Sequence, residues 1–346
     1  VSQVRSFESI AARRLDRHGP LGKAASECTR RTFIQSLQEY LSLTWPGLIV
    51  LAVYVATLAP TVTGEDSGEF ITAAYFFGVP HPPGYPLWTM LCGAWLHLFP
   101  FGNIAWRANL FSAVCMALAI ITMNSVLRRM GFRPLVSGTA SLTCGLGSAV
   151  WSQSVIAEVY SLNLLLTALL LRCFVDWQTA RNNRVLCLAS LLFGLGMANH
   201  HIIGFAALGL AMWAIWQSPK LLLNMSLILR CGAMFMLGLL PYAYLLWAAS
   251  RHVPIKWGET TNLAALWEHV SRGQYVSDHP IEAIVPMTFA LFAGQLYYGL
   301  RWIGSEFTPY LLPVMFAGLA WLHRRRSKNT WLRLTLLLFV TCGALY

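Results

Sequence analysis

Residues 108–127 read ANLFSAVCMALAIITMNSVL, twenty consecutive residues without a charged side chain. A helix rises about 1.5 Å per residue, so about 20 apolar residues cross the roughly 30 Å hydrocarbon core of a bilayer. Arg128, Arg129 and Arg133 follow immediately. The stretch therefore predicts a transmembrane helix that ends at a basic connector.

Comparable apolar stretches recur along the chain. They cover residues 45–60, 108–127, 135–150, 159–171, 185–199, 202–217, 231–249, 307–323 and 331–346. The residues AVILMFWYC make up 56% of the 346 positions and DEKR only 11%, whereas an ordinary soluble domain has about 25% charged residues. We predict an all-α polytopic integral membrane protein with nine to eleven long hydrophobic helices. Its domains would be a cytoplasmic basic tail (1–44) and one transmembrane domain (45–346), and because the sequence stops inside an apolar run, truncation is one interpretation.

The net charge of +11 is concentrated in short connectors between these stretches. Basic connectors mark the cytoplasmic side of a membrane protein, and no basic stripe interleaved with aromatic residues indicates nucleic acid as a partner. With the tail inside, Arg128, Arg129 and Arg133 stay inside only if segment 84–99 does not cross. The same assignment of the later connectors requires that segment 284–303 does not cross either. We therefore predict that those two segments are re-entrant or interfacial.

This orientation places nearly every unusual polar residue on the outer side. They are Glu65, Asp66, Glu69, His81, Glu158, His200, His201, Glu259, Arg272, Asp278 and His279. A transporter more often has its polar residues near the bilayer midplane, on broken helices. The one-sided set instead predicts a site at the outer interface, with the lipid bilayer as a partner.

The first outer loop holds a dense acidic cluster and a proline-rich run. Asp66 and Glu69 would share one face of a helix from about Ser67 to Phe77. Their spacing also fits a capping box, with Asp66 as N-cap, and the two roles are compatible. Residues 79–87 read VPHPPGYPL, and four prolines exclude a regular helix. A stiff extended turn that holds His81 is predicted.

These motifs resemble a known family. The runs GEDSGEF (64–70), HPPGYPL (81–87) and RAN (107–109) resemble the first outer loop of GT-C protein O-mannosyltransferases of the transmembrane protein 260 type and their bacterial relatives. Four later runs are similar in kind: AEVYSLN (157–163), GLGMANHH (194–201), GLLPY (238–242) and SRGQY (271–275). The resemblance extends from about residue 45 to 326.

The resemblance implies a GT-C-like helical bundle with interfacial helices in the first outer loop. It also implies an inverting glycosyltransferase that moves a sugar, mannose by resemblance, from a polyprenyl-phosphate donor to a hydroxyl acceptor. We expect the acceptor to be protein Ser or Thr, with a glycan or lipid left open. The membrane would be a bacterial inner membrane or the endoplasmic reticulum, with the active site non-cytoplasmic. No cofactor is expected, and no metal, because the outer carboxylates and histidines lack a ligand spacing.

Asp66 matches the family position thought to act as catalytic base, since the acceptor hydroxyl loses a proton as it attacks. Arg272 is chosen for phosphate neutralisation, because a guanidinium matches phosphate geometry. The full predicted substrate-binding set is Glu65, Glu69, His81, Tyr85, Glu158, Tyr160, His200, His201 and Arg272. Glu158 has an alternative role as the cap of a helix starting at Val159. Structural roles also remain open for the histidines.

Two other functions stay open. A transporter or flippase of a lipid-linked substrate is the alternative, motivated by Arg172 and Arg230 in or near predicted spans. A non-enzymatic membrane scaffold would use the outer loop as a partner surface.

Overall fold

The computed structural model describes residues 20–273, 275, 293–295, 297–299, 301, 317–318, 320, 324 and 329–339. Within these ranges the regular elements are helices, with one isolated β-bridge between Val79 and Lys256. The all-α prediction is confirmed. Most of the predicted segments 284–303 and 307–323 lies outside the described residues, as do the end of 331–346, Asp278 and His279.

In chain order the helices are α2 (Pro20–Ala56), α3 (Ser67–Phe76), α4 (Pro86–Leu98), α5 (Ile104–Arg129), α6 (Pro134–Gly145), α7 (Ser148–Ser154), α8 (Tyr160–Ala180), α9 (Asn183–Met197), α10 (Ile203–Gln217), η2 (Pro219–Leu223), α11 (Met225–Gly238), η3 (Leu240–Tyr242), α12 (Ala243–Ala249), α13 (Leu263–Val270) and α17 (Asn329–Phe339). The chain forms two compact units, Val1–Trp45 and Pro46–Tyr346. Helix α2 passes from the first into the second and contains Pro46. The cytoplasmic location of the basic tail stays a prediction.

Four described helices are long and apolar enough to cross a membrane: Gln35–Ala56, Ile104–Arg129, Tyr160–Ala180 and Met225–Ala249. This bears out a multi-pass membrane protein, and the stretch 108–127 lies inside α5 as predicted. The expectation of nine to eleven long helices is too high for the part of the chain that the structure describes. Helices α9 and α10 are apolar but have only 15 residues each.

The predicted span 135–150 is not one helix. It forms α6, with 12 residues, and continues after a break into α7. Twelve residues reach about 18 Å, short of the roughly 30 Å core. Helix α4, which corresponds to the segment 84–99, has 13 residues. That length agrees with the prediction that this segment does not cross.

Close helix packing fixes the core of the second unit. Helix α5 packs along α8, and α9 packs along α11. At the second contact a Cβ on Gly194 would lie 2.3 Å from the carbonyl oxygen of Phe235, so only glycine allows this approach. Of the two arginines that suggested a transporter, Arg172 is paired, because its Nε lies 2.8 Å from Asp176 Oδ2 on the same helix. Arg129 joins this pair at 3.3 Å from Asp176 Oδ1. Arg230 Nε donates to Ser226 O at 3.0 Å.

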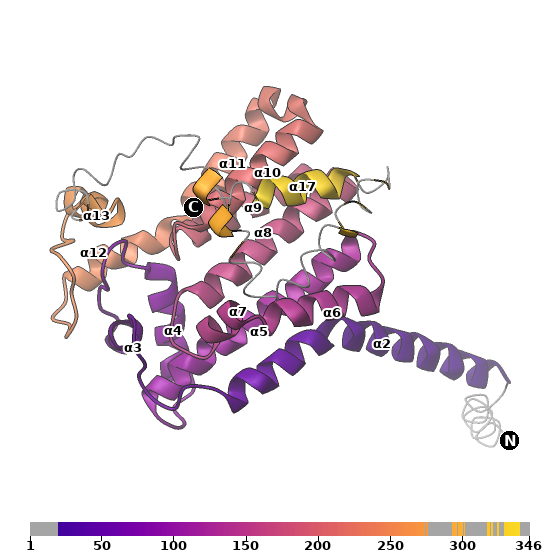
Figure 1. Cartoon of the computed structure of the whole chain (residues 1–346), viewed down its shortest axis with the longest axis horizontal. Coiled ribbons are helices and arrows are strands. Elements are labelled where there is room, and N and C mark those ends of the chain that lie inside the picture. Colours follow the sequence, from indigo (N-terminus) through magenta and orange to yellow (C-terminus); the bar gives the residue numbers. More distant parts are fainter. Residues whose placement is uncertain are drawn as a thin grey trace, which may run out of the picture. The chain divides into compact units, whose positions relative to one another are not determined.

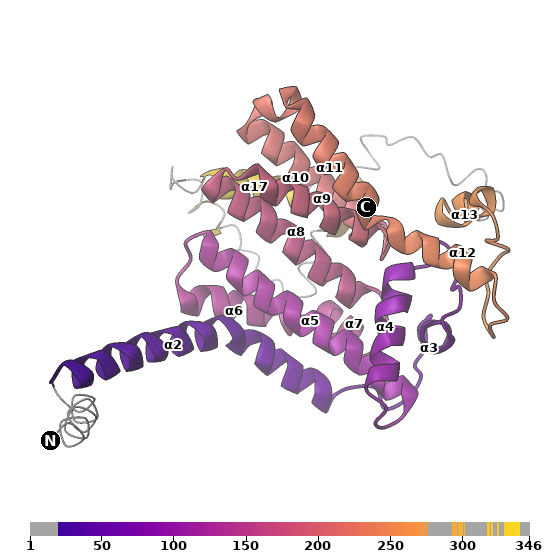
Figure 2. The same ribbon diagram turned by 180° about the vertical axis from the view of Figure 1, so that it is seen from behind.

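The polar residues of the predicted site lie near helix ends. Helices α5, α8 and α10 begin, and α9 and α12 end, at the end of the unit where α3, α4 and α13 also lie (Figures 1 and 2). Hydrogen bonds tie these ends together, such as Leu87 N–H to Ala198 O at 3.1 Å and Asn199 Nδ2 to Val159 O at 3.2 Å. The far ends of α5 and α8 carry Arg129 and the Arg172–Asp176 pair. Of the predicted outer set, Asp66, Glu69, His81, His200 and Arg272 lie together at this end. The side that faces the cytosol stays a prediction.

Candidate functional site

The Asp66 turn, residues 64–67, presents the first carboxylate of the site. Glu65 adopts the left-handed conformation with φ +57°, and Asp66 is the N-cap residue of α3. The Asp66 side chain makes no capping hydrogen bond, so the predicted capping box is wrong. Its carboxylate is 56% exposed. Asp66 is therefore accessible to a substrate, and Glu69 is free for another partner.

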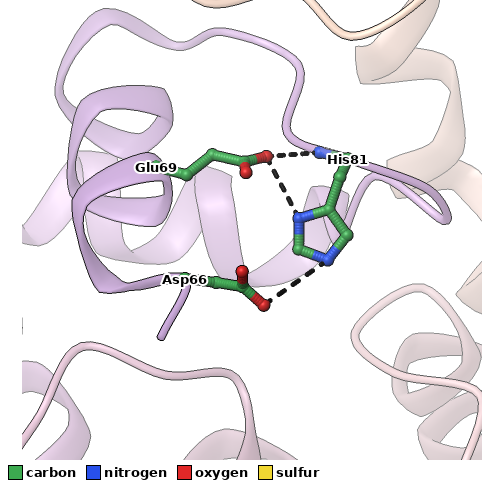
Figure 3. A group of neighbouring side chains, drawn as sticks. All are labelled: Asp66, Glu69 and His81. Atoms are coloured by element: carbon green, nitrogen blue, oxygen red, sulfur yellow. Dashed lines mark hydrogen bonds and ion pairs between the residues drawn. The ribbon is translucent and has the colours of Figure 1, made fainter. Parts of the chain in front are cut away.

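That partner is His81, which lies between the two carboxylates (Figure 3). His81 Nδ1 is 3.1 Å from Glu69 Oε1, and the same oxygen accepts the backbone N–H of His81. On the other edge of the ring, Nε2 is 3.8 Å from Asp66 Oδ2 and 3.0 Å from Tyr85 Oη. The structure thus joins Asp66, Glu69, His81 and Tyr85, all four predicted as site residues.

The charge on His81 follows from this arrangement. Burial lowers the pKa of His81, but the hydrogen bond and charge of Glu69, helped by Asp66, outweigh it and leave the pKa above its ordinary value. The donor atoms of Asp66, Glu69 and His81 also lie within 4.8 Å of one another, close enough to share a cation. A protonated imidazole would compete with a metal for the same two carboxylates, because metal binding needs neutral histidine. We keep the expectation of a metal-free site as a prediction.

The proline-rich run is anchored at several points, while its stiffness stays a prediction. Val79 N–H donates to Ile255 O at 3.1 Å, and Val79 O accepts Trp257 N–H at 2.9 Å. His269 Nε2, on α13, lies 3.2 Å from Pro80 O. Gly84 has φ +90°, where a Cβ would also meet the Leu245 side chain at 2.7 Å. Pro86 then occupies the first turn of α4, a favoured position for proline.

Arg272 brings a cation to the same site, at the hydroxyl of Tyr85. Its Nη2 lies 3.4 Å from Tyr85 Oη, and its Nε is buried without a hydrogen-bond partner. Among the residues that the structure describes, it joins no ion pair. Its backbone has φ +60°, an unusual conformation for a residue with a side chain. An unpaired guanidinium in this position is suited to an anionic ligand.

The two adjacent histidines are neutral and have different orientations. Burial, and then the charge of Arg272, lower the pKa of His200 to about 4 and lower that of His201 as well. His200 Nδ1 accepts the N–H of Ile202 at 3.1 Å, so its proton is on Nε2. Its ring stacks on Tyr85, with centroids 5.7 Å apart. His201 Nε2 is 2.9 Å from Tyr242 Oη, which in turn donates to a backbone carbonyl.

Glu158 and Tyr160 also reach this end of the bundle. The ring of Tyr160 is 5.5 Å from that of His200 and 39% of the residue is exposed. Glu158 is only 2% exposed. It does not cap α8, whose N-cap is Val159 and lacks a side-chain cap, so that alternative is wrong. Trp257 is 44% exposed beside His81, which leaves anchoring and sugar stacking both open.

Two residues of this site were missing from the predicted set, although Tyr242 ends the GLLPY run (238–242) quoted above. His269 is buried on α13 and holds the proline-rich run, and burial lowers its pKa to about 4, so it is neutral. Tyr242 orients His201. Both lie in apolar helical segments that look like ordinary interfacial or core sequence. Only the packing of α13 and η3 against the first loop shows their role.

Comparison with known proteins bears out the predicted resemblance. Residues 66–222 match the family described as protein O-mannosyl-transferase TMEM260 N-terminal domain. The chain is 35% identical over 236 residues to the Mus musculus protein O-mannosyl-transferase TMEM260, covering 65% of this chain and 33% of that protein. It is 27% identical over 248 residues to its Dictyostelium discoideum counterpart, covering 64% and 29%.

The chain thus spans about a third of the length of these curated relatives. A solved structure, the S. cerevisiae protein O-mannosyltransferase Pmt1-Pmt2 complex bound to the sugar donor, is similar with a TM-score of 0.49 and 18% identity. That likeness covers 61% of this chain and 33% of the other, and we draw nothing further from it.

Proposed function

We infer that this chain, similar over residues 66–222 to the protein O-mannosyl-transferases, belongs to an enzyme that transfers mannose from a polyprenyl phosphate to a protein hydroxyl. The transfer would take place on the non-cytoplasmic side of its membrane. One observation carries the proposal: the Tyr85 hydroxyl lies 3.4 Å from Nη2 of Arg272 and 3.0 Å from Nε2 of His81, and the same His81 nitrogen is 3.8 Å from the exposed carboxylate of Asp66. Among the described residues, Arg272 joins no ion pair. A base and a phosphate-binding cation are what this reaction requires.

The surroundings of Arg272 support a lipid phosphate as donor. A cavity of about 500 Å³ is lined by residues of α9, α11 and α13 and by Ser271, the chain neighbour of Arg272. Its lining is mainly apolar, with Phe235, Leu239 and Leu266 among its residues, and it also includes His201. An anionic headgroup at Arg272 would therefore leave its hydrocarbon chain next to an apolar groove. A water-soluble nucleotide sugar would have no use for such a groove.

In the proposed step, the acceptor oxygen forms a bond to the anomeric carbon while the bond from that carbon to the phosphate oxygen breaks. The acceptor proton goes to Asp66, and the electron pair of the broken bond stays on the phosphate. Arg272 offsets the charge that accumulates there, as electrostatic stabilisation of a leaving group requires. His81, held by Glu69, orients the Asp66 carboxylate. A single displacement inverts the anomeric centre, and no second nucleophilic carboxylate is needed.

The test is transfer by the full-length protein in nanodiscs, with synthetic polyprenyl-phosphate mannose and a peptide rich in Ser and Thr. We expect Asp66→Asn to lower the rate by a factor of roughly 10² to 10⁴, the usual contribution of a positioned base. The matched control is Glu259→Gln, which removes an exposed carboxylate paired with Lys256 in the neighbouring loop. Its rate should stay close to that of the wild type.

Loss of transfer in both variants would point to an unspecific charge effect, and undiminished transfer by Asp66→Asn would exclude Asp66 as the base. Arg272→Met should raise the KM for the lipid-linked donor more than that for the peptide. Movement of the lipid across liposomes without sugar transfer would support the flippase alternative instead.

A further inference from the structure

The hydroxyl of Tyr85 connects the two charged parts of the site. Its oxygen lies 3.0 Å from Nε2 of His81 and 3.4 Å from Nη2 of Arg272. His81 is in turn 3.8 Å from Asp66 Oδ2. Within the described ranges, no ion pair joins Arg272 to Asp66 directly. The proposed transfer step uses Asp66 and Arg272 but gives no role to the hydroxyl that lies between their neighbours.

The Tyr85 oxygen accepts hydrogen bonds from two positive groups. Glu69 Oε1 accepts the backbone N–H of His81 and lies 3.1 Å from Nδ1, so Nδ1 carries a proton. The raised pKa of His81 indicates that Nε2 carries a proton as well and donates it to Tyr85. The guanidinium of Arg272 has donors only. One neutral oxygen therefore separates an imidazolium from a guanidinium.

The backbone and the ring of Tyr85 fix this oxygen without help from Arg272. Tyr85 is the N-cap residue of α4 and has φ +40°. Its ring is stacked on His200 with centroids 5.7 Å apart, and it meets Phe70 edge-on at 5.1 Å. Only 5% of the residue is exposed. A buried ring in close contact with two others has little freedom to turn, so its hydroxyl is a fixed acceptor.

Arg272 has much less to hold it in place. In the part of the chain that the structure describes, its side chain makes one hydrogen bond, to Tyr85, and its Nε is buried without a partner. Its charge acts against that of His81 and lowers the pKa of that imidazole, so the two groups repel each other. His81 is also bound by Glu69, but Arg272 has no such second anchor. Without the Tyr85 oxygen, the long Arg272 side chain would regain its rotamer freedom and move away from His81.

We propose that Tyr85 is a positioning residue whose hydroxyl oxygen holds the guanidinium of Arg272 where the donor phosphate binds. This inference rests on the proposed function, which assigns Arg272 to the phosphate. Because the same oxygen also binds His81, it keeps the phosphate cation at a constant distance from the base, Asp66. The attacking and leaving oxygens lie on opposite sides of one carbon, so a constant distance between base and cation favours the reactive geometry.

The experiment is a double-mutant cycle of Tyr85→Phe and Arg272→Met in the full-length protein in nanodiscs. Phenylalanine keeps the ring contacts and removes only the oxygen. Tyr85→Phe should raise the KM for polyprenyl-phosphate mannose about tenfold, the usual effect of one lost hydrogen bond to a charged group. The KM for the peptide should stay within about twofold of the wild type. In the Arg272→Met protein, Tyr85→Phe should change the donor KM by less than about twofold, because the group that Tyr85 holds is gone.

Tyr244→Phe is the matched control. Its hydroxyl donates to Gly78 O at 2.8 Å, so this variant also loses a buried tyrosine hydrogen bond beside the proline-rich run. The partner that it loses is a backbone carbonyl and not Arg272, so its donor KM should stay within about twofold of the wild type. The inference is overturned if Tyr244→Phe raises the donor KM as much as Tyr85→Phe, or if Tyr85→Phe keeps its full effect in the Arg272→Met protein.

Binding of a fluorescent polyprenyl phosphate, which lacks the sugar, separates this inference from the proposed function. Its Kd should rise about tenfold in Tyr85→Phe and should show the same coupling to Arg272→Met. A wild type that binds this lipid with that coupling but transfers no mannose would reject the proposed function and support the role of Tyr85. Normal transfer by the wild type, with the two substitutions additive in both assays, would reject the role of Tyr85 alone.

Discussion

Replacing Glu158 by glutamine should stabilise the folded protein at alkaline pH. The pKa of Glu158 in the fold is about 7, against an ordinary value of 4.5, because the side chain is buried beside Asp66 and Glu65. In the unfolded chain the carboxyl ionises above pH 4.5, while in the folded protein it keeps its proton up to about pH 7. The unfolded state therefore binds fewer protons between these values, and stability falls as pH rises through this window.

The size of the loss follows from the same two values. Each pKa unit corresponds to about 1.4 kcal/mol, so a difference of about 2.5 units corresponds to roughly 3 kcal/mol. The full loss is reached above pH 7 and is absent below pH 4.5. Because Glu158 is almost completely buried, solvent screening reduces this figure little. A glutamine has the same shape and no charge, so its variant should not show this loss.

The assay is unfolding of the detergent-solubilised protein, followed by tryptophan fluorescence at pH 4.5, 6, 7 and 8. The wild type and Glu158→Gln should have similar midpoints at pH 4.5 and should diverge by several degrees at pH 8, with the variant more stable. Glu259→Gln, an exposed substitution, is the control and should follow the wild type. Parallel curves for the wild type and Glu158→Gln across this range would refute the burial of an uncharged carboxyl at this position.

Three further results are expected. Glu69→Gln removes the main group that raises the pKa of His81, so ¹⁵N NMR of labelled imidazoles should show His81 losing its proton at a lower pH. His269→Ala leaves the Pro80 carbonyl without its partner and should cost about 1–3 kcal/mol, seen as a lower unfolding midpoint. Gly194→Val places a side chain against the α11 backbone and should cost about 1–3 kcal/mol, whereas an unchanged midpoint would mean that α9 and α11 can separate freely.

The presence of apolar helices could be predicted from local sequence, because it depends on residues that are close together along the chain. Twenty uncharged residues followed by arginines define α5 whatever the rest of the chain does. Proline spacing likewise predicts the stiff run at His81. Helix lengths were less predictable. The stretch 135–150 contains no charged residue, yet it breaks into α6 and α7, and the absence of charge does not reveal where a helix ends.

The candidate site was likewise only partly predictable from the sequence. The set of candidate polar residues could be chosen from the sequence alone, because the distribution of charged and hydrophobic residues predicts which side of a membrane a loop faces without reference to tertiary contacts. Their partners were decided only by the fold: Glu69 binds His81 instead of capping α3, and Glu158 is buried near the negative charges of Asp66 and Glu65. Such pairings join residues 12 to almost 200 positions apart. They depend on which helix ends pack together, and the order of residues along one segment does not contain that information.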